Sequence, residues 1–336
     1  MSSVNDLGIY QIGLETTMGT LVATTNRLIS RGLIVTPQEP VFQPQAQLGY
    51  LLENPTSDTV ALRSVDMKLS GDLTFEQILY VLSMAMKGVT AGTGANPDKT
   101  WAYDPTYAAD PSLKSFTVQR RLSDGTTNWD EAIAYVMARD FRVGGQIGQN
   151  ATFEANLFGR PADTTVTLTP TIGVPTVNFI PVSLFKVFVD NTYASLGATQ
   201  VSASIYSFEF RFRSQAQPKF YVDGRTDKSF TAHGLKRAGF DLDLDAEWTA
   251  AINTERGKAA DRSIRYVRLQ ALGATLGSSQ YEFRIDLACR YQAGLFDKET
   301  EREGNDALKL KLIGAFDSTN SLAAKITVVN GLTSLP

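Results

Sequence analysis

The sequence predicts a mainly β protein made of two tandem antiparallel domains of sandwich or barrel type, each with one short flanking α-helix. Three observations support this: strand-like alternation along much of the chain, two isolated segments with helical spacing, and the same order of elements in both halves. The chain has 336 residues, of which 43% are hydrophobic and 20% charged. That length corresponds to roughly two domains of about 150 residues, and that composition is typical of folded proteins.

Alternation of apolar and polar residues is clearest at residues 206–212, where aromatic residues occupy every second position and mostly charged residues lie between them. The same pattern predicts strands at residues 65–69, 116–118, 153–157, 185–189, 240–244, 281–289 and 308–312. Strands that bury one face and expose the other are typical of antiparallel sheets. Turns are predicted at the pairs Asp124-Gly125, Gly144-Gly145, Asp223-Gly224 and Gly304-Asn305.

Two segments have helical spacing instead. In the first, apolar residues recur between Phe75 and Met86, after a capping-box start at Thr74 and before Gly88. The second covers residues 248–255, with Asp245 as the expected N-cap and Gly257 as the expected end. We therefore expect one short helix at each place.

The order of these elements suggests an internal duplication. Residues 65–69 precede the first helix as residues 240–244 precede the second, and residues 153–159 resemble residues 308–314. The predicted domains are residues 1–180 and 181–336. The first carries an additional segment, residues 88–113, which we expect to be a long loop, and the Thr- and Pro-rich residues 164–181 are expected to link the domains.

Composition excludes several kinds of chemistry. Lys and Arg total 32 against 35 Asp and Glu, giving a net charge of −3, which argues against a large cationic surface for nucleic acid. A single cysteine, Cys289, and a single histidine, His233, exclude an internal disulfide framework and a multi-His zinc site. His233 is expected in a surface loop. The sequence predicts no catalytic, cofactor or metal site, no secretion signal, and no enzyme activity.

The acids Asp241, Asp243 and Asp245 resemble the start of a calcium-binding loop. That motif requires glycine at its sixth position and glutamate at its twelfth, where this chain has Ala246 and Ile252. We therefore expect the three acids on the solvent-facing side of a strand. A row of acids there would repel a passing polyanion.

Several motifs resemble the tail tube proteins of long-tailed bacteriophages. The opening residues 9–20 contain the turn sequence Glu15-Thr-x-x-Gly19-Thr20 after an apolar strand, which is similar to the start of many such proteins. Residues 65–73, followed by an apolar helix, resemble their passage from strand to helix, and residues 116–119 and 143–147 also look similar.

The resemblance implies β-sandwich or barrel domains of tail-tube type that form stacked rings, with six domains per ring around a channel for viral DNA. A two-domain chain would then form a trimeric ring with pseudo-sixfold symmetry, and the solvent-facing side expected for Asp241, Asp243 and Asp245 could be the side that faces the channel. It also implies the partners: further copies of this chain, a tape measure protein, tail completion proteins, and double-stranded DNA that passes through without tight binding. The expected location is the virion tail, after assembly in the host cytoplasm.

The loop at residues 88–113 and the N-terminal arm, residues 1–20, are the expected bridges between stacked rings. The candidate contact residues are Trp101, Tyr103, Tyr107, Glu15 and Thr20. The alternative interpretation is a β-rich receptor- or glycan-binding tail component that would use the same three aromatic residues. The least favoured interpretation is a hydrolase that would use Asp241, Asp243 or Glu247 as a catalytic carboxylate. A tube of the related contractile or secretion type also fits the sequence.

Overall fold

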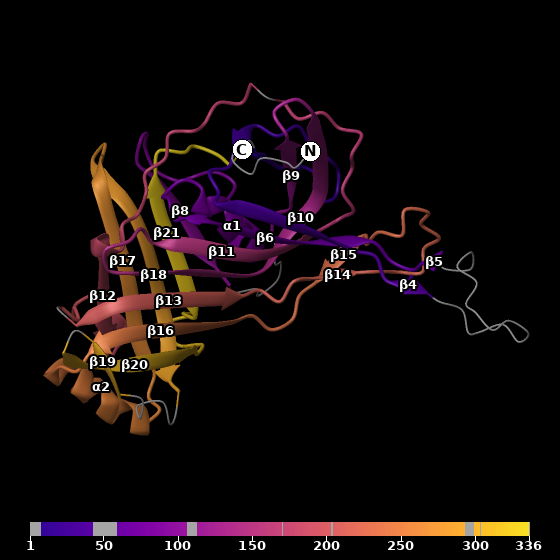
Figure 1. The fold of residues 1–336 in the computed structure, drawn as a ribbon. Coiled ribbons are helices and arrows are strands. Elements are labelled where there is room, and N and C mark those ends of the chain that lie inside the picture. The colour runs from indigo at the N-terminus through magenta and orange to yellow at the C-terminus, as the bar shows by residue number, and fades with distance from the viewer. Residues whose placement is uncertain are drawn as a thin grey trace, which may run out of the picture.

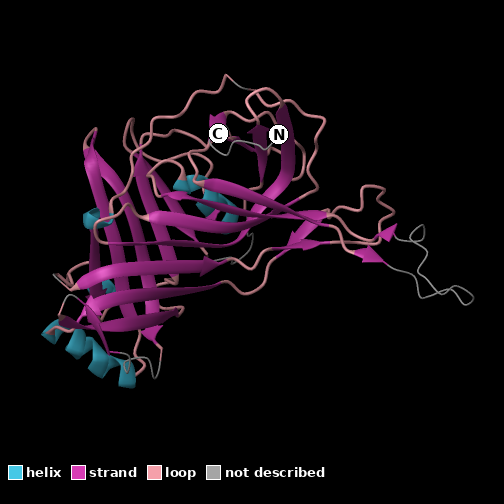
Figure 2. Ribbon diagram, in the orientation of Figure 1, coloured by secondary structure: helices cyan, strands magenta, loops and turns pink. Residues whose placement is uncertain are grey.

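The computed structural model describes residues 8–42, 59–105, 113–169, 171–202, 204–292, 299–302 and 304–335. The fold is mainly β, with 54% strand and 8% helix, and its strand pairs are antiparallel. Figure 1 shows two layers of strands that cross each other steeply, and an arm that extends to one side. Figure 2 shows how little helix accompanies them.

The first layer, here called the main sheet, is a continuous series of paired strands. In spatial order these are β3 (Gly32–Gln38), β6 (Ser64–Asp72), β11 (Thr152–Gly159), β10 (Asn128–Gln146), β13 (Ile205–Arg213), β16 (Gly239–Glu247), β20 (Asn305–Gly314) and β19 (Glu299–Arg302).

The second layer, here called the second sheet, packs across the main sheet (Figure 1). Its strands are, in spatial order, β12 (Phe185–Asp190), β17 (Arg265–Leu276), β18 (Ser279–Tyr291), β21 (Ala324–Asn330), β8 (Lys99–Asp104) and β7 (Lys87–Gly88). A smaller group contains β2 (Asn26–Arg27), β1 (Ile9–Leu14), β9 (Phe116–Ser123) and the first part of β10. The arm contains β4 (Val41–Phe42), β5 (Thr59–Val60), β14 (Gln217–Lys219) and β15 (Ala232–Gly234).

Two series of strands follow the same pairing order. In the first, β1 pairs with β9, then β10, β11, β6 and β3 follow; in the second, β12 pairs with β17, then β18, β20, β16 and β13. The registers also agree, because Leu69 lies opposite Ala155 in the first series and Leu244 lies opposite Leu310 in the second. These are the positions that the sequence comparison aligned.

The two series are joined by strand pairing. From Asp140 opposite Arg213 to Gln146 opposite Ser207, the end of β10 pairs with β13. In the other sheet, β8 pairs with β21. The main sheet therefore runs through both series without a break, and the division at residue 180 stays a prediction.

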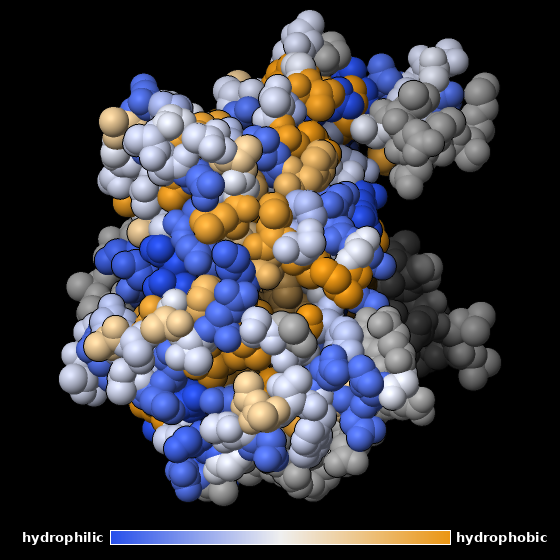
Figure 3. Space-filling model, turned by 90° about the vertical axis from the view of Figure 1, so that its left-hand side faces the viewer, coloured by the Kyte–Doolittle hydropathy of each residue, from blue (hydrophilic) through white to orange (hydrophobic). Residues whose placement is uncertain are grey.

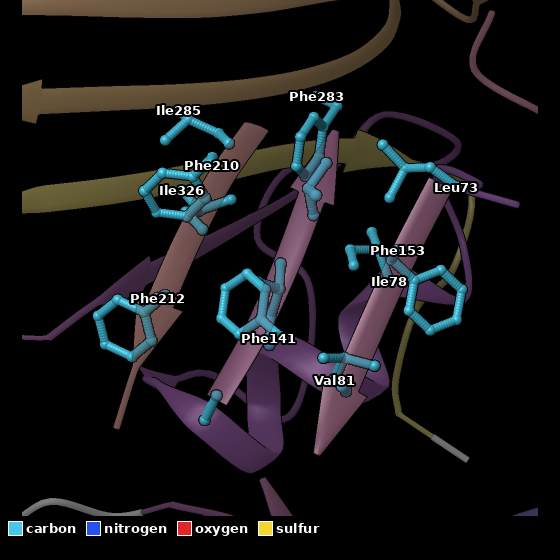
Figure 4. Packing of buried hydrophobic residues seen from close by; sticks show 14 of the residues in the cluster. Leu73, Ile78, Val81, Phe141, Phe153, Phe210, Phe212, Phe283, Ile285 and Ile326 are labelled. Atoms are coloured by element: carbon cyan, nitrogen blue, oxygen red, sulfur yellow. The ribbon is translucent and has the colours of Figure 1, made fainter. Parts of the chain in front are cut away.

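The hydrophobic core lies between the two sheets. Figure 4 shows Phe210 and Phe212 of β13 and Phe141 of β10 beside Phe283 and Ile285 of β18, and all five are fully buried. The predicted alternation of β13 is therefore confirmed. Tyr206 is the exception to this burial pattern: it is only partly buried, and its hydroxyl donates a hydrogen bond to Glu247.

Both predicted helices are present. The first, α1 (Ile78–Ala85), begins after Thr74, whose hydroxyl accepts a hydrogen bond from the Gln77 amide, and all its residues are buried. The second, α2 (Ala250–Ala260), is capped by Thr249 rather than Asp245 and continues through Gly257. It lies at one end of the molecule (Figure 1). Two short 3-10 helices, η3 (Val182–Leu184) and η4 (Tyr193–Ser195), flank β12.

Two sequence predictions about loops are wrong. Gly144 and Gly145 do not form a turn but lie inside β10, where a Cβ on Gly144 would come within 2.6 Å of the Phe208 carbonyl oxygen. Glycine is needed there because β13 approaches the backbone closely. The segment 88–113 is not simply a loop either, because it contains β8, which is held in the second sheet by backbone pairing with β21. Residues 106–112 lie outside the described residues.

Candidate assembly surface

The outer face of the main sheet is the side turned away from the core. A groove of about 700 Å³ runs across this face over strands β6, β11, β10, β13, β16 and β20. Its lining includes four basic and four acidic residues: Arg31, Arg142, Lys309, Lys311, Glu154, Glu209, Asp243 and Asp245. Because the positive and negative charges lining the groove are equal in number, we do not expect this face to bind phosphate groups strongly.

The three acids predicted on a solvent-facing strand do lie on β16, but they do not form a bare acidic row. Asp241 is buried and forms an ion pair with Arg213 of β13. Asp243 and Asp245 lie opposite Lys311 and Lys309 of β20. Basic residues on both neighbouring strands therefore offset the repulsion that the sequence alone suggested.

Two carboxylates of this face have opposite pKa shifts. Burial raises the pKa of Asp243, and the charge of Lys311 offsets this only in part. Burial also opposes ionisation of Glu154, but hydrogen bonds from Lys68 and Arg142, at 3.0 and 2.9 Å, hold its pKa below the usual value. The outer face is thus well compensated near β11 and less so near β16.

Trp101 and Tyr103, predicted as exposed ring contacts, are fully buried. The indole of Trp101 donates a 2.9 Å hydrogen bond to Asn330, and the hydroxyl of Tyr103 lies 3.0 Å from that of Ser83 in α1. Asn330 in turn donates to the Phe75 carbonyl. These side chains therefore join the two strand series inside the chain and offer no surface to a neighbouring ring. Tyr107 lies outside the described residues.

Glu15 is also buried, in a turn after β1. Its carboxylate accepts hydrogen bonds from the backbone amides of Gly19 and Tyr135 and from the hydroxyls of Ser115 and Thr117. This carboxylate explains the Glu-Thr-x-x-Gly-Thr pattern physically: it closes the turn, and Gly19 has a positive φ of 78°. Thr20 alone among the described candidate contacts is exposed.

The edges of the main sheet were not singled out by the sequence. Within the described residues, β3 has only β6 as a partner, and β19 has only β20. On β3, Ile34 is 63% exposed, a large apolar side chain on a sheet edge. Such edges are sites where another strand can add to the sheet.

A second surface lies on the side of the molecule that carries β12 and α2. Figure 3 shows apolar side chains gathered across the middle of this side. A groove of about 330 Å³ between β12 and the start of β13 is lined by Ile147, Phe185, Val201 and Ile205, among others.

The described residues contain no group of three or more His, Cys, Asp or Glu placed to hold a metal ion. His233 lies on β15, not in a loop, and its Nδ1 is 3.1 Å from the hydroxyl of Tyr135. Burial, with the nearby Lys219, lowers the pKa of His233. In the part of the chain described above, no helix combines the length and apolarity that crossing a bilayer requires. No protein-family model matches the chain, and no curated protein matches it.

Proposed function

We propose that this chain is the structural subunit of a bacteriophage tail tube, in which rings of three chains stack around a channel that conducts viral DNA. The observation that carries this proposal is the pairing of β10 with β13, which joins two strand series of the same pairing order into one sheet. A chain that already contains two ring positions needs three copies to supply six. The motifs at residues 9–20 and 65–73 support the same function.

The charge of the outer face suits such a channel. Four acidic and four basic residues line its groove, so a passing polyanion would be neither held nor strongly repelled. The chain would assemble in the host cytoplasm, reside in the virion tail, and contact a tape measure protein and tail completion proteins. The alternative of a glycan-binding tail component loses support, because Trp101 and Tyr103 are buried and cannot stack on a sugar.

Negative-stain electron microscopy of the purified protein, before and after concentration, tests the proposal. We expect rings with a threefold outline, or tubes with a stain-filled central channel. A discrete oligomer without a channel would contradict the proposal and favour a binding module. A glycan array would then be the next measurement.

A further inference from the structure

Among the residues that the structure describes, the main sheet ends in two strands that have a partner on one side only. At one end lies β3, paired with β6, and at the other end lies β19, paired with β20. Unpaired strand edges present backbone N–H and C=O groups that can bond to a further strand. The two edges lie at opposite ends of the same sheet, so one chain cannot satisfy them by pairing them with each other.

The repeated pairing order identifies the counterpart of each edge strand. Leu33 of β3 lies opposite Leu69, and Phe208 of β13 lies opposite Leu244, so β3 occupies the place that β13 has in the second series. Similarly, Val143 of β10 lies opposite Phe153, and Glu299 of β19 lies opposite Leu308. The strand β19 therefore occupies the place of the end of β10.

The two counterpart strands, β13 and the end of β10, pair with each other inside the chain. Glu209 of β13 lies opposite Gly144 of β10 in this internal junction. From this we infer that β3 of one chain pairs antiparallel with β19 of a second copy, with Ile34 opposite Thr300. The inference rests on the proposed tube function and deepens it, since it names the two edges that close the ring and the register between them.

This junction also determines which face of the sheet encloses the channel. The inner face of the main sheet is covered by the second sheet and by α1 (Figures 1 and 4). A sheet that closes on itself around an axis must therefore turn its outer face, which carries the groove, toward that axis. A head-to-tail contact of this kind uses two different surfaces, so it can close into a ring.

Paired cysteines test the register. In the variant Ile34→Cys with Thr300→Cys, the two Cα atoms would face each other across an antiparallel pair, at about 4.5 to 5.5 Å, within the range of a disulfide. The native Cys289 is buried and should not interfere. After mild oxidation, non-reducing gel electrophoresis should show covalent species of two and three chains and nothing larger.

Two matched variants control this experiment. Ile34→Cys with Arg302→Cys moves one thiol two residues along the strand, about 6.6 Å, beyond the reach of a disulfide, and should give little cross-linking. Ser207→Cys with Gln146→Cys tests the internal junction, whose Cα atoms are direct partners, and should cross-link within a single chain. Mixing the two single-cysteine chains, Ile34→Cys and Thr300→Cys, should give covalent dimers only.

The outcomes separate the junction from the proposed function. Rings by microscopy without cross-links between positions 34 and 300, while the internal control cross-links, would overturn the junction and leave the tube intact. Cross-links that continue into long polymers without rings would support the edge pairing and contradict the ring. Equal cross-linking of the Arg302→Cys control would overturn the register.

Discussion

The two strand series share a pairing order but are stabilised differently around their helices. In the first series α1 is apolar and entirely buried, and it packs against β10, β7 and β8. In the second series, the α2 side chains whose burial is described are mostly exposed or partly exposed, and only Ile252 and Glu255 among them are buried. The Glu255 carboxylate pairs with the buried Arg265 guanidinium. The same topology therefore tolerates either an apolar helix in the core or a polar helix at the surface that is anchored by an ion pair.

A second difference concerns the additional segment of the first series. Its strand β8 crosses into the second sheet and pairs with β21, so the first series contributes to the layer that the second series mainly builds. Among the described strands, the second series has no equivalent of β8 that pairs with a strand at the outer end of the first series. The two halves are thus unequal, and positions related by the repeat need not contribute equally to stability.

The largest expected effect on stability comes from Trp101, the β8 side chain that joins the two strand series inside the chain. Trp101→Ala should lower the free energy of unfolding by about 3 to 5 kcal/mol, because it leaves a large cavity and removes the hydrogen bond to Asn330. Urea unfolding followed by circular dichroism measures this. The matched control is Trp129→Ala, whose side chain is 46% exposed and should change stability by less than about 1 kcal/mol. An equal loss of unfolding free energy in the two variants would contradict the inference that β8 stabilises the contact between the two strand series.

Trp101 also shows what the sequence could not provide. Strand and helix positions such as β13 and α1 follow from local periodicity, which is why they were predicted. The burial of Trp101 depends on Val328, its partner in β21 more than two hundred residues away. No local pattern separates such a strand from a loop with aromatic residues.

Glycine was a second source of error, since it serves both turns and close backbone contacts. The pair Gly144-Gly145 was interpreted as a turn although it marks the site where β13 joins β10. Of the acids predicted on the solvent-facing side of a strand, Asp243 and Asp245 are partly exposed on β16, but Asp241 is buried against Arg213. Their neutralisation depends on Arg213 and Lys311, which come from other strands. Partners across a sheet are not visible in a single segment.

An intermediate effect is expected at the turns that follow the first strand of each series. Glu15, just after β1, accepts four hydrogen bonds, whereas Asp190, at the end of β12, accepts two, from the amides of Gly197 and Thr199. In Glu15→Gln an amide nitrogen would face donors, and the loss should be about 1 to 3 kcal/mol.

Asp190→Asn should cost less than Glu15→Gln, about 1 kcal/mol, because the new amide nitrogen would face one donor instead of two. Thermal unfolding of both variants measures the difference. Glu39→Gln is the control: Glu39 forms an ion pair with Arg63 on the surface, and its side chain is 46% exposed, so its melting temperature should scarcely change. If Asp190→Asn were the more damaging variant, the Glu15 turn would not be the stronger of the two.

The smallest effect concerns two carboxylates on the outer face, one from each series. The raised pKa of Asp243 means that the folded state binds its proton more readily than the unfolded chain, so stability falls as pH rises through the interval above the ordinary value of 3.8. Asp243→Asn should therefore stabilise the protein slightly at about pH 7, by less than about 1 kcal/mol, and have no such effect at about pH 3.

Glu154 should behave oppositely, because its lowered pKa contributes stability above the ordinary value of 4.5 that is lost as pH falls through the folded value. Glu154→Gln should lower the urea midpoint at about pH 7 and less so at about pH 3. The contrast arises from partners: Glu154 contacts both Lys68 and Arg142, while one oxygen of Asp243 has no hydrogen-bond partner among the described residues. A destabilising Asp243→Asn at neutral pH would mean that attraction to Lys311 outweighs burial. The outer face would then be compensated as well near β16 as it is near β11.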